Sequence, residues 1–115
     1  MSRDRIFLLE PGFEDPKRPG EAFFCPFSNQ IEGVLVSHPK LASRLEVSKL
    51  PFPRPRHPVA ELVGEDHQSL PLLILGDDIP APSDAATAAS GLRFVNDTRR
   101  ILELLAERHD IPRPH

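Results

Sequence analysis

Apolar residues gather in short runs along the chain, and four of these runs predict β-strands. The runs within 5–10 and 69–76 do not alternate with polar residues and are bounded by proline, glycine or polar positions. This pattern is typical of strands buried on both faces of a sheet. Residues 46–52 alternate and residues 92–95 form a brief apolar segment, so each predicts a further strand.

Between the predicted strands at 5–10 and 46–52, the spacing of apolar residues becomes helical. A stripe at i, i+4, i+7 and i+8 begins at Phe27 and predicts a helix from 26 to about 38. Pro39 disfavours continuation of that helix, although residues 40–45 could add one more turn. The residues before it, 13–24, carry prolines and glycine and are expected to form a loop.

Two more helices are expected later in the chain. Pro58 and Gly64 bracket a short one, since proline is tolerated at the first helical position and glycine is common just past the end. Asn96 is a suitable N-cap for an amphipathic helix over 97–109. The predicted order of elements is therefore βαβαββα.

The remaining segments complete a single domain over residues 1–115. A chain of 115 residues with 39% hydrophobic content can build one core but not two ordinary ones. Residues 77–91 are small and polar and predict a flexible loop, which could hold one helical turn at 85–89. Residues 110–115 are expected to form a loose C-terminal tail.

Composition and charge argue against several classes of function. The net charge is −3, and no aromatic residues are interleaved with lysine or arginine, so a nucleic-acid partner is not expected. No apolar run approaches the roughly 20 residues of a membrane span, and the expected location is the cytoplasm. The five histidines lack the spacing of metal ligands, and no metal is expected; they are His38, His57, His67, His109 and His115.

The only cysteine, Cys25, stands just before Pro26, where the first helix is predicted to begin. Proline at the first helical position leaves the N–H groups of Phe27 and Ser28 free to point toward the sulfur. These donors and the positive end of the helix dipole favour a thiolate. A lone cysteine is also commonly a small buried apolar residue. The Ser28 hydroxyl could contact the thiolate or satisfy backbone groups at the helix terminus.

Three segments together resemble the thioredoxin-like superfamily, in its glutaredoxin and glutathione-transferase N-terminal form. Residues 25–30, CPFSNQ, are similar to the Cys-Pro-Phe/Tyr-x active-site turn of glutaredoxins, omega-type glutathione transferases, dehydroascorbate reductases and chloride intracellular channel proteins. Residues 69–73 are similar to the cis-proline segment, and residues 96–101 to the Glu-Ser-x-x-Ile element. The whole chain also resembles a small bacterial family of thioredoxin-like proteins with no assigned function.

This resemblance implies an α/β fold with a four-stranded mixed sheet and flanking helices. It implies that Cys25 is the reactive thiol in a turn formed by Pro26, Phe27 and Ser28, with glutathione as co-substrate. The backbone of Leu70, before a cis Pro71, would pair with the cysteinyl part of glutathione. Asp97 and Thr98 would take its γ-glutamyl end, and Arg54 or Arg56 its glycyl carboxylate.

The sequence also departs from these families. Ser28 occupies the position of the second cysteine of dithiol glutaredoxins, so a mixed disulfide on Cys25 needs an external thiol for its resolution. The chain has no room for the helical second domain of the transferases. The leading hypothesis is a glutathione-linked monothiol oxidoreductase that acts on a thiol or disulfide substrate. The alternative is a thioredoxin-fold binding or assembly module in which Cys25 is a spectator or redox sensor, with self-association to a homodimer left open.

Overall fold

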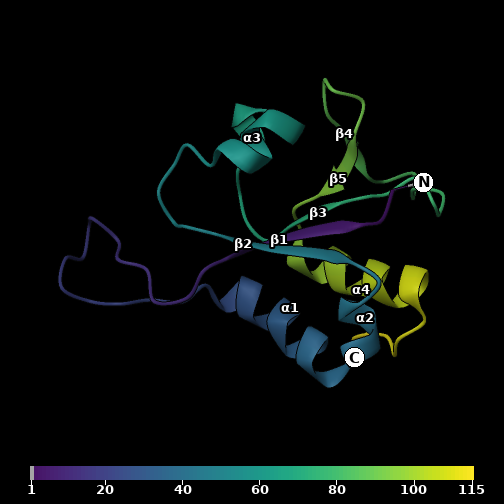
Figure 1. Cartoon of the computed structure of the whole chain (residues 1–115), viewed down its shortest axis with the longest axis horizontal. Helices are drawn as coiled ribbons and strands as arrows, with labels where there is room; N and C mark the ends of the chain where they lie inside the picture. The colour runs from purple at the N-terminus through teal and green to yellow at the C-terminus, as the bar shows by residue number, and fades with distance from the viewer. Residues whose placement is uncertain (1) are drawn as a thin grey trace.

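A mixed five-stranded sheet forms the centre of the computed structural model, which describes residues 2–115 (Figure 1). The strands lie in the order β2-β1-β3-β5-β4. β1 and β2 are parallel, and the other three pairings are antiparallel. The strand bounds are β1 Arg5–Leu9, β2 Glu46–Leu50, β3 Leu72–Ile74, β4 Ala86–Thr87 and β5 Arg93–Val95.

Helices cover both faces of this sheet. α1 and α4 lie against one face and α3 against the other, as Figure 1 shows. The bounds are α1 Pro26–Ser37, α2 Pro39–Ala42, α3 His57–Val63 and α4 Thr98–His109, with a short 3₁₀ turn η1 at Glu65–His67. No helix within residues 2–115 is long and apolar enough to cross a membrane.

The two-sided covering explains the unalternated apolar runs. In β1, Ile6 and Leu8 belong to the core beneath α1 and α4, while Phe7 belongs to the core beneath α3. In β3, Leu73 faces the first core and Leu72 the second. Because neighbouring side chains of a strand point to opposite faces, a strand covered on both sides must be apolar at every position.

The structure has five strands where the sequence predicts four. The additional strand, β4, lies within the predicted 77–91 loop, where the sequence suggested a helical turn instead. A hairpin joins it to β5, and the Ala88 N–H donates to the Leu92 carbonyl at 2.8 Å. Both residues of β4 are exposed and small, so the strand depends on its pairing with β5 and leaves no apolar pattern in the sequence.

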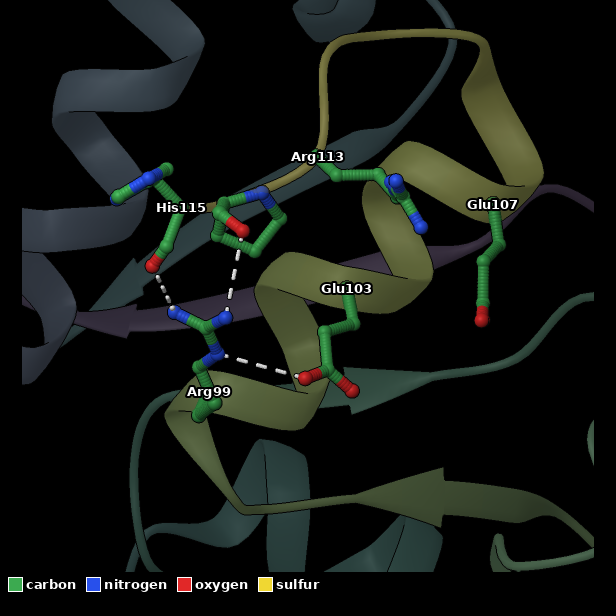
Figure 2. A pocket seen from close by; sticks show the side chains of 6 residues that line it. Arg99, Glu103, Glu107, Arg113 and His115 are labelled. Carbon is green, nitrogen blue, oxygen red and sulfur yellow. Dashed lines mark hydrogen bonds and ion pairs between the residues drawn. The ribbon is translucent and has the colours of Figure 1, made fainter.

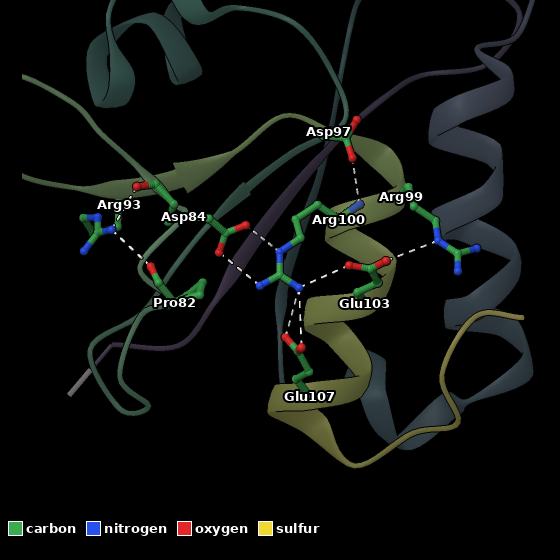
Figure 3. A network of polar contacts seen from close by, with 9 residues as sticks. Pro82, Asp84, Arg93, Asp97, Arg99, Arg100, Glu103 and Glu107 are labelled. Carbon is green, nitrogen blue, oxygen red and sulfur yellow. Dashed lines mark hydrogen bonds and ion pairs between the residues drawn. The ribbon is translucent and has the colours of Figure 1, made fainter.

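An ion pair links residues 77–91 to α4, as Figure 3 shows. The Arg100 guanidinium donates to both oxygens of Asp84, at 2.7 and 3.0 Å, and also reaches Glu103 and Glu107. Its hydrogen bonds with Asp84 raise the pKa of Arg100 above its ordinary value and lower that of Asp84. Residues 77–91 are therefore not simply the flexible loop that the sequence predicts.

The N-cap of α4 is Asp97 and not the predicted Asn96. The Asp97 carboxylate accepts a hydrogen bond from the Arg100 N–H at 2.9 Å, as a capping side chain does. The Asn96 side-chain amide instead donates to the Ser69 carbonyl at 3.0 Å. Asn96 thereby holds the start of α4 beside the loop that precedes β3.

A buried carboxylate joins the two ends of the chain. Asp4, fully buried before β1, accepts hydrogen bonds at 2.7 Å from two nitrogens of Arg108 and from the Gly76 N–H. Nε2 of His109 lies 2.8 Å from Oδ2 of Asp4, the oxygen that also accepts from Nε of Arg108. Burial raises the pKa of Asp4, but the hydrogen bonds from His109, Arg108 and Gly76 outweigh it and hold that pKa well below its usual range. The sequence analysis did not single out Asp4.

Candidate functional site

Cys25 lies at the N-terminus of α1, as the sequence predicts. It is the N-cap residue, and Pro26 follows at the first helical position. The Ser28 N–H donates to the Cys25 sulfur at 3.4 Å, while the Phe27 N–H makes no such contact. The cysteine is half-buried, and its neighbours along the chain include two exposed phenylalanines, Phe24 and Phe27. The sulfur accepts a hydrogen bond from one backbone donor of the helix start.

Ser28 connects the start of α1 to β1. Its side chain is buried, and its hydroxyl accepts a hydrogen bond from the Leu9 N–H at 3.1 Å. Leu9 is the last residue of β1, so the hydrogen bond links the N-terminus of α1 to the end of this strand. The sequence left open whether this hydroxyl contacts the Cys25 thiolate or satisfies a backbone group at the helix terminus. It satisfies a backbone group, but that group is the Leu9 N–H of β1 and does not belong to the helix.

A pocket of about 380 Å³ lies beside this helix start. It is formed where the N-terminal end of α1, the loop before β3 and the N-terminal end of α4 come together. Its lining residues are Phe27, Gln30, Leu70, Pro71, Asn96, Asp97, Thr98 and Arg99. Five of these are predicted site residues from three distant segments: Phe27, Leu70, Pro71, Asp97 and Thr98. Cys25 is next to the pocket in sequence but is not among its lining residues.

The Leu70–Pro71 peptide bond at the edge of this pocket is cis, as the resemblance implies. Leu70 is half-buried and Pro71 is buried. Proline has no N–H, so the strand that follows begins its pairing only at Leu72. A second cis bond, Arg54–Pro55, was not expected from the sequence.

The opposite side of the pocket is the N-terminus of α4. The first N–H groups of a helix have no partner within it and carry the positive end of its dipole, so they suit an anion. One oxygen of Asp97 already accepts from the Arg100 N–H and caps this end. The hydroxyl residue Thr98 begins the helix itself.

Gln30, Asn96 and Arg99 line the pocket but were not expected to belong to a site. Gln30 lies one helical turn after Phe27, which is the only sequence signal that could have identified it. Figure 2 shows Arg99 on α4, where its guanidinium pairs with Glu103 and donates to the carbonyls of the C-terminal residues Pro114 and His115. These contacts hold the tail of the chain against α4.

The two arginines predicted for a glycyl carboxylate do not line the pocket. Arg54 is exposed, whereas Arg56 is buried. Three N–H groups of the Arg56 guanidinium donate to backbone carbonyls, those of Phe52 and Gln68. A buried guanidinium with these bonds is poorly suited to the predicted contact, so Arg54 is the better candidate of the pair.

Two of the five histidines pack against other side chains. His109 contacts Asp4, and the His67 ring packs 4.9 Å from the centroid of Phe94. Among residues 2–115, no group of three or more His, Cys, Asp or Glu side chains is placed to hold a metal ion.

Comparison with known proteins gives one match. Residues 3–113 match a protein family described as "Protein of unknown function (DUF3088)". No curated protein and no solved structure matches the chain significantly. Since the match covers nearly the whole chain, this protein belongs to the DUF3088 family.

Proposed function

We propose that this protein is a thiol–disulfide oxidoreductase of the thioredoxin-like fold that uses Cys25 as its single reactive thiol and glutathione as co-substrate. The observation that carries the proposal is the Cys25 sulfur at the N-cap of α1, bonded to the Ser28 N–H beside a pocket formed by Pro71 and the start of α4. No other cysteine is present, so the chemistry requires an external thiol.

The arrangement of strands supports the proposed fold. β1 and β2 are parallel neighbours, β3 and β5 add to them in antiparallel orientation, and helices cover both faces. The order of elements agrees with the predicted βαβαββα except for the additional α2, η1 and β4, and β4 lies at the edge next to β5. The thiol at the start of α1 and the cis-proline before β3 lie at one end of this sheet.

The pocket supports glutathione as the co-substrate. In the proposed complex, the backbone of Leu70 pairs with the cysteinyl part of glutathione, next to the Cys25 sulfur. The free N–H groups of α4 and the Thr98 hydroxyl bind the γ-glutamyl carboxylate, since a helix N-terminus favours anions. Asp97 takes the γ-glutamyl ammonium, and the exposed Arg54 takes the glycyl carboxylate.

The proposed reaction has two exchange steps. First, the Cys25 thiolate attacks the glutathionyl sulfur of a mixed disulfide; a Cys25–glutathione disulfide forms and the substrate leaves as a thiolate, which takes up a proton. Then the thiolate of a second glutathione attacks the glutathionyl sulfur on Cys25. Oxidised glutathione is released and Cys25 returns as a thiolate, so overall one free glutathione thiol converts the mixed disulfide into the substrate thiol and oxidised glutathione.

Activity is tested with the mixed disulfide of glutathione and 2-mercaptoethanol, with glutathione reductase and NADPH reporting on oxidised glutathione. We expect turnover by the wild-type protein and none above background for Cys25→Ser. Val36→Ser is the control, because Val36 is 79% exposed at the other end of α1 and should leave turnover unchanged. Mass spectrometry after incubation with oxidised glutathione should find one adduct, on Cys25.

The same experiment distinguishes the proposed oxidoreductase from the alternative, a binding module. A wild-type protein that neither turns over the mixed disulfide nor accepts a glutathionyl adduct contradicts the oxidoreductase proposal. Turnover that persists in Cys25→Ser contradicts the assignment of the reactive group.

A further inference from the structure

Arg56 is a buried cation without an anionic side-chain partner at salt-bridge distance. It is 7% exposed, and it takes part in none of the ion pairs among residues 2–115. Arginine stays protonated in proteins, so this charge cannot be removed by titration. A buried charge is costly unless it is paired, and charged residues in protein interiors usually have a partner of opposite sign.

The immediate surroundings of Arg56 supply only dipoles. Its Nε and Nη2 donate to the Phe52 carbonyl at 3.1 and 2.7 Å, and Nη1 donates to the Gln68 carbonyl at 2.8 Å. The Phe52 ring lies under the guanidinium, 5.7 Å from ring centroid to Cζ. These contacts hold the guanidinium in one orientation. None of these contacts is with an anion, so no neighbouring negative charge neutralises the guanidinium.

The sheet brings this cation and Cys25 to the same edge. β1 and β2 are parallel and end in register at Leu9 and Leu50. The end of β1 is bonded to Ser28, whose N–H contacts the Cys25 sulfur. Two residues beyond the end of β2 lies Phe52, the carbonyl partner of Arg56.

A row of aromatic rings makes a second connection. Phe23, two residues before Cys25, pairs through its backbone with Phe13. The Phe13 ring stacks on Phe52 at 4.4 Å between centroids, and Phe52 carries the Arg56 guanidinium. The chain that leads into Cys25 is thus packed against the residues that hold Arg56.

Electrostatics agree with this placement. Burial lowers the pKa of Arg56 and so does the charge of Arg54, whereas a negative charge on Cys25 raises it. A negative charge on Cys25 is therefore close enough to the Arg56 guanidinium to interact with it.

We propose that Arg56 is a positioning residue whose buried guanidinium serves as the counter-charge of the Cys25 thiolate. This inference rests on the thiolate of the proposed function but not on glutathione. It also assigns Arg56 a role different from the glutathione contact predicted from the sequence. Arg56 acts on the thiol through its charge, held in place by the two carbonyls and the Phe52 ring.

The first test measures alkylation of Cys25 by iodoacetamide, which is neutral and reacts only with the thiolate. At pH 7, Arg56→Gln should react about fivefold more slowly than the wild type, and Arg56→Lys, which keeps the charge, within about twofold of it. At pH 10, well above the ordinary thiol pKa of about 8.5, the rates should converge. Arg44→Gln is the matched control, since Arg44 also donates to a backbone carbonyl, that of His109 at 2.8 Å.

Two results overturn the inference. One is an Arg56→Gln rate at pH 7 equal to that of the wild type. The other is an equal slowing at pH 7 and pH 10, which indicates altered access to the sulfur and not altered charge. A wild type without glutathione turnover that still shows the expected pattern contradicts the proposed function alone. Normal turnover with no effect of Arg56→Gln on alkylation contradicts this inference alone.

The second test leaves Arg56 unchanged and therefore decides the question even if its variants do not fold. Cys25→Asp places a fixed negative charge at the N-cap of α1, and Cys25→Asn is its neutral isostere. The Asp variant should have the higher urea midpoint at pH 7. Asp97→Asn at the N-cap of α4 measures what the helix dipole alone contributes. An Asp-over-Asn difference at position 25 no larger than the one at position 97 contradicts a role for Arg56.

Discussion

Gly76 lies where two segments of backbone pass too close for any side chain. A Cβ at this position would meet the carbonyl oxygen of Ser2 and would lie 2.7 Å from that of Arg3. Both neighbours are backbone atoms, so neither can rotate away. The Gly76 N–H is also held by the Asp4 carboxylate. The close approach is therefore part of the way in which the N-terminal segment is fixed to the end of β3.

Gly76→Ala should destabilise the protein by about 1–3 kcal/mol, because an overpacked backbone contact forces the chain to shift. Urea unfolding followed by circular dichroism measures the effect. Gly33→Ala is the matched control, since its Cβ would meet nothing within 4 Å and the position lies within α1. It should raise stability by up to about 1 kcal/mol, because alanine is the better helix former. Equal effects of the two substitutions would contradict the steric argument.

Single residues also mark where sequence reasoning about the site ends. The position of Cys25 follows from Pro26 and the helical spacing after it, which are local signals. The Ser28 hydroxyl is directed inward by its contact with β1, and the burial of Arg56 involves its contact with Gln68; both partners are distant in sequence. An arginine in a proline-rich segment looks exposed in the sequence, and only the chain packed around it makes Arg56 part of the interior.

At the scale of elements, α4 shows why helix termini are hard to place from sequence. Asn96 and Asp97 are both good N-caps, and the predicted cap is the first of them. The choice between them depends on the path of the chain, since the Asn96 amide is used by the Ser69 carbonyl and only Asp97 reaches back to the Arg100 N–H.

Asp97→Ala should therefore cost about 1 kcal/mol of stability, the typical loss for a removed N-cap side chain. Asn96→Ala should cost less, about 0.5 kcal/mol, because its hydrogen bond is exposed and lies outside the helix. Thermal or urea unfolding of both variants in parallel makes the comparison. A larger loss for Asn96→Ala would contradict the assignment of Asp97 as the cap.

The strands differ in how far their sequences predict them. β1 and β3 are covered on both faces, and the resulting apolar runs made them recognisable. β4 has two exposed residues, and its existence follows from the β5 strand beside it and from the ion pair between Asp84 and Arg100. Such a strand is specified by tertiary contacts, and the spacing of apolar residues in the sequence does not predict those contacts.

At the scale of the whole molecule, the chain is closed by a polar contact between its beginning and its end. Asp4 precedes β1, while Arg108 and His109 form the last turn of α4. The side chains of Asp4 and Arg108 are 0% and 4% exposed. The carboxylate therefore fixes α4 to the central strands from inside the molecule. It lies at the opposite end of α4 from the Asp97 and Thr98 pocket, so it supports the site only through the position of the helix.

Asp4→Asn should destabilise the protein by about 3–5 kcal/mol at pH 7, because it leaves a buried arginine without its charge partner. Asp84→Asn is the matched control: it removes the carboxylate of a surface pair between Asp84 and Arg100, whose side chains are 54% and 25% exposed, and should cost much less, because solvent screens an exposed pair. Urea unfolding at pH 7 compares the two. A loss at Asp4 no greater than that at Asp84 would show that the buried contact is not a main support of α4.

The acid stability of the protein should depend on the same carboxylate. The folded-state pKa of Asp4 lies below its unfolded value. The ionised form therefore stabilises the fold fully above the unfolded pKa of about 4, and this stabilisation is lost as the pH falls below it toward the folded pKa. Asp4→Asn has no such proton to bind, so the difference in unfolding free energy between wild type and variant should shrink steadily below about pH 4. A difference that stays constant between pH 7 and pH 3 would mean that Asp4 carries no depressed pKa, and that its contribution comes from packing and not from charge.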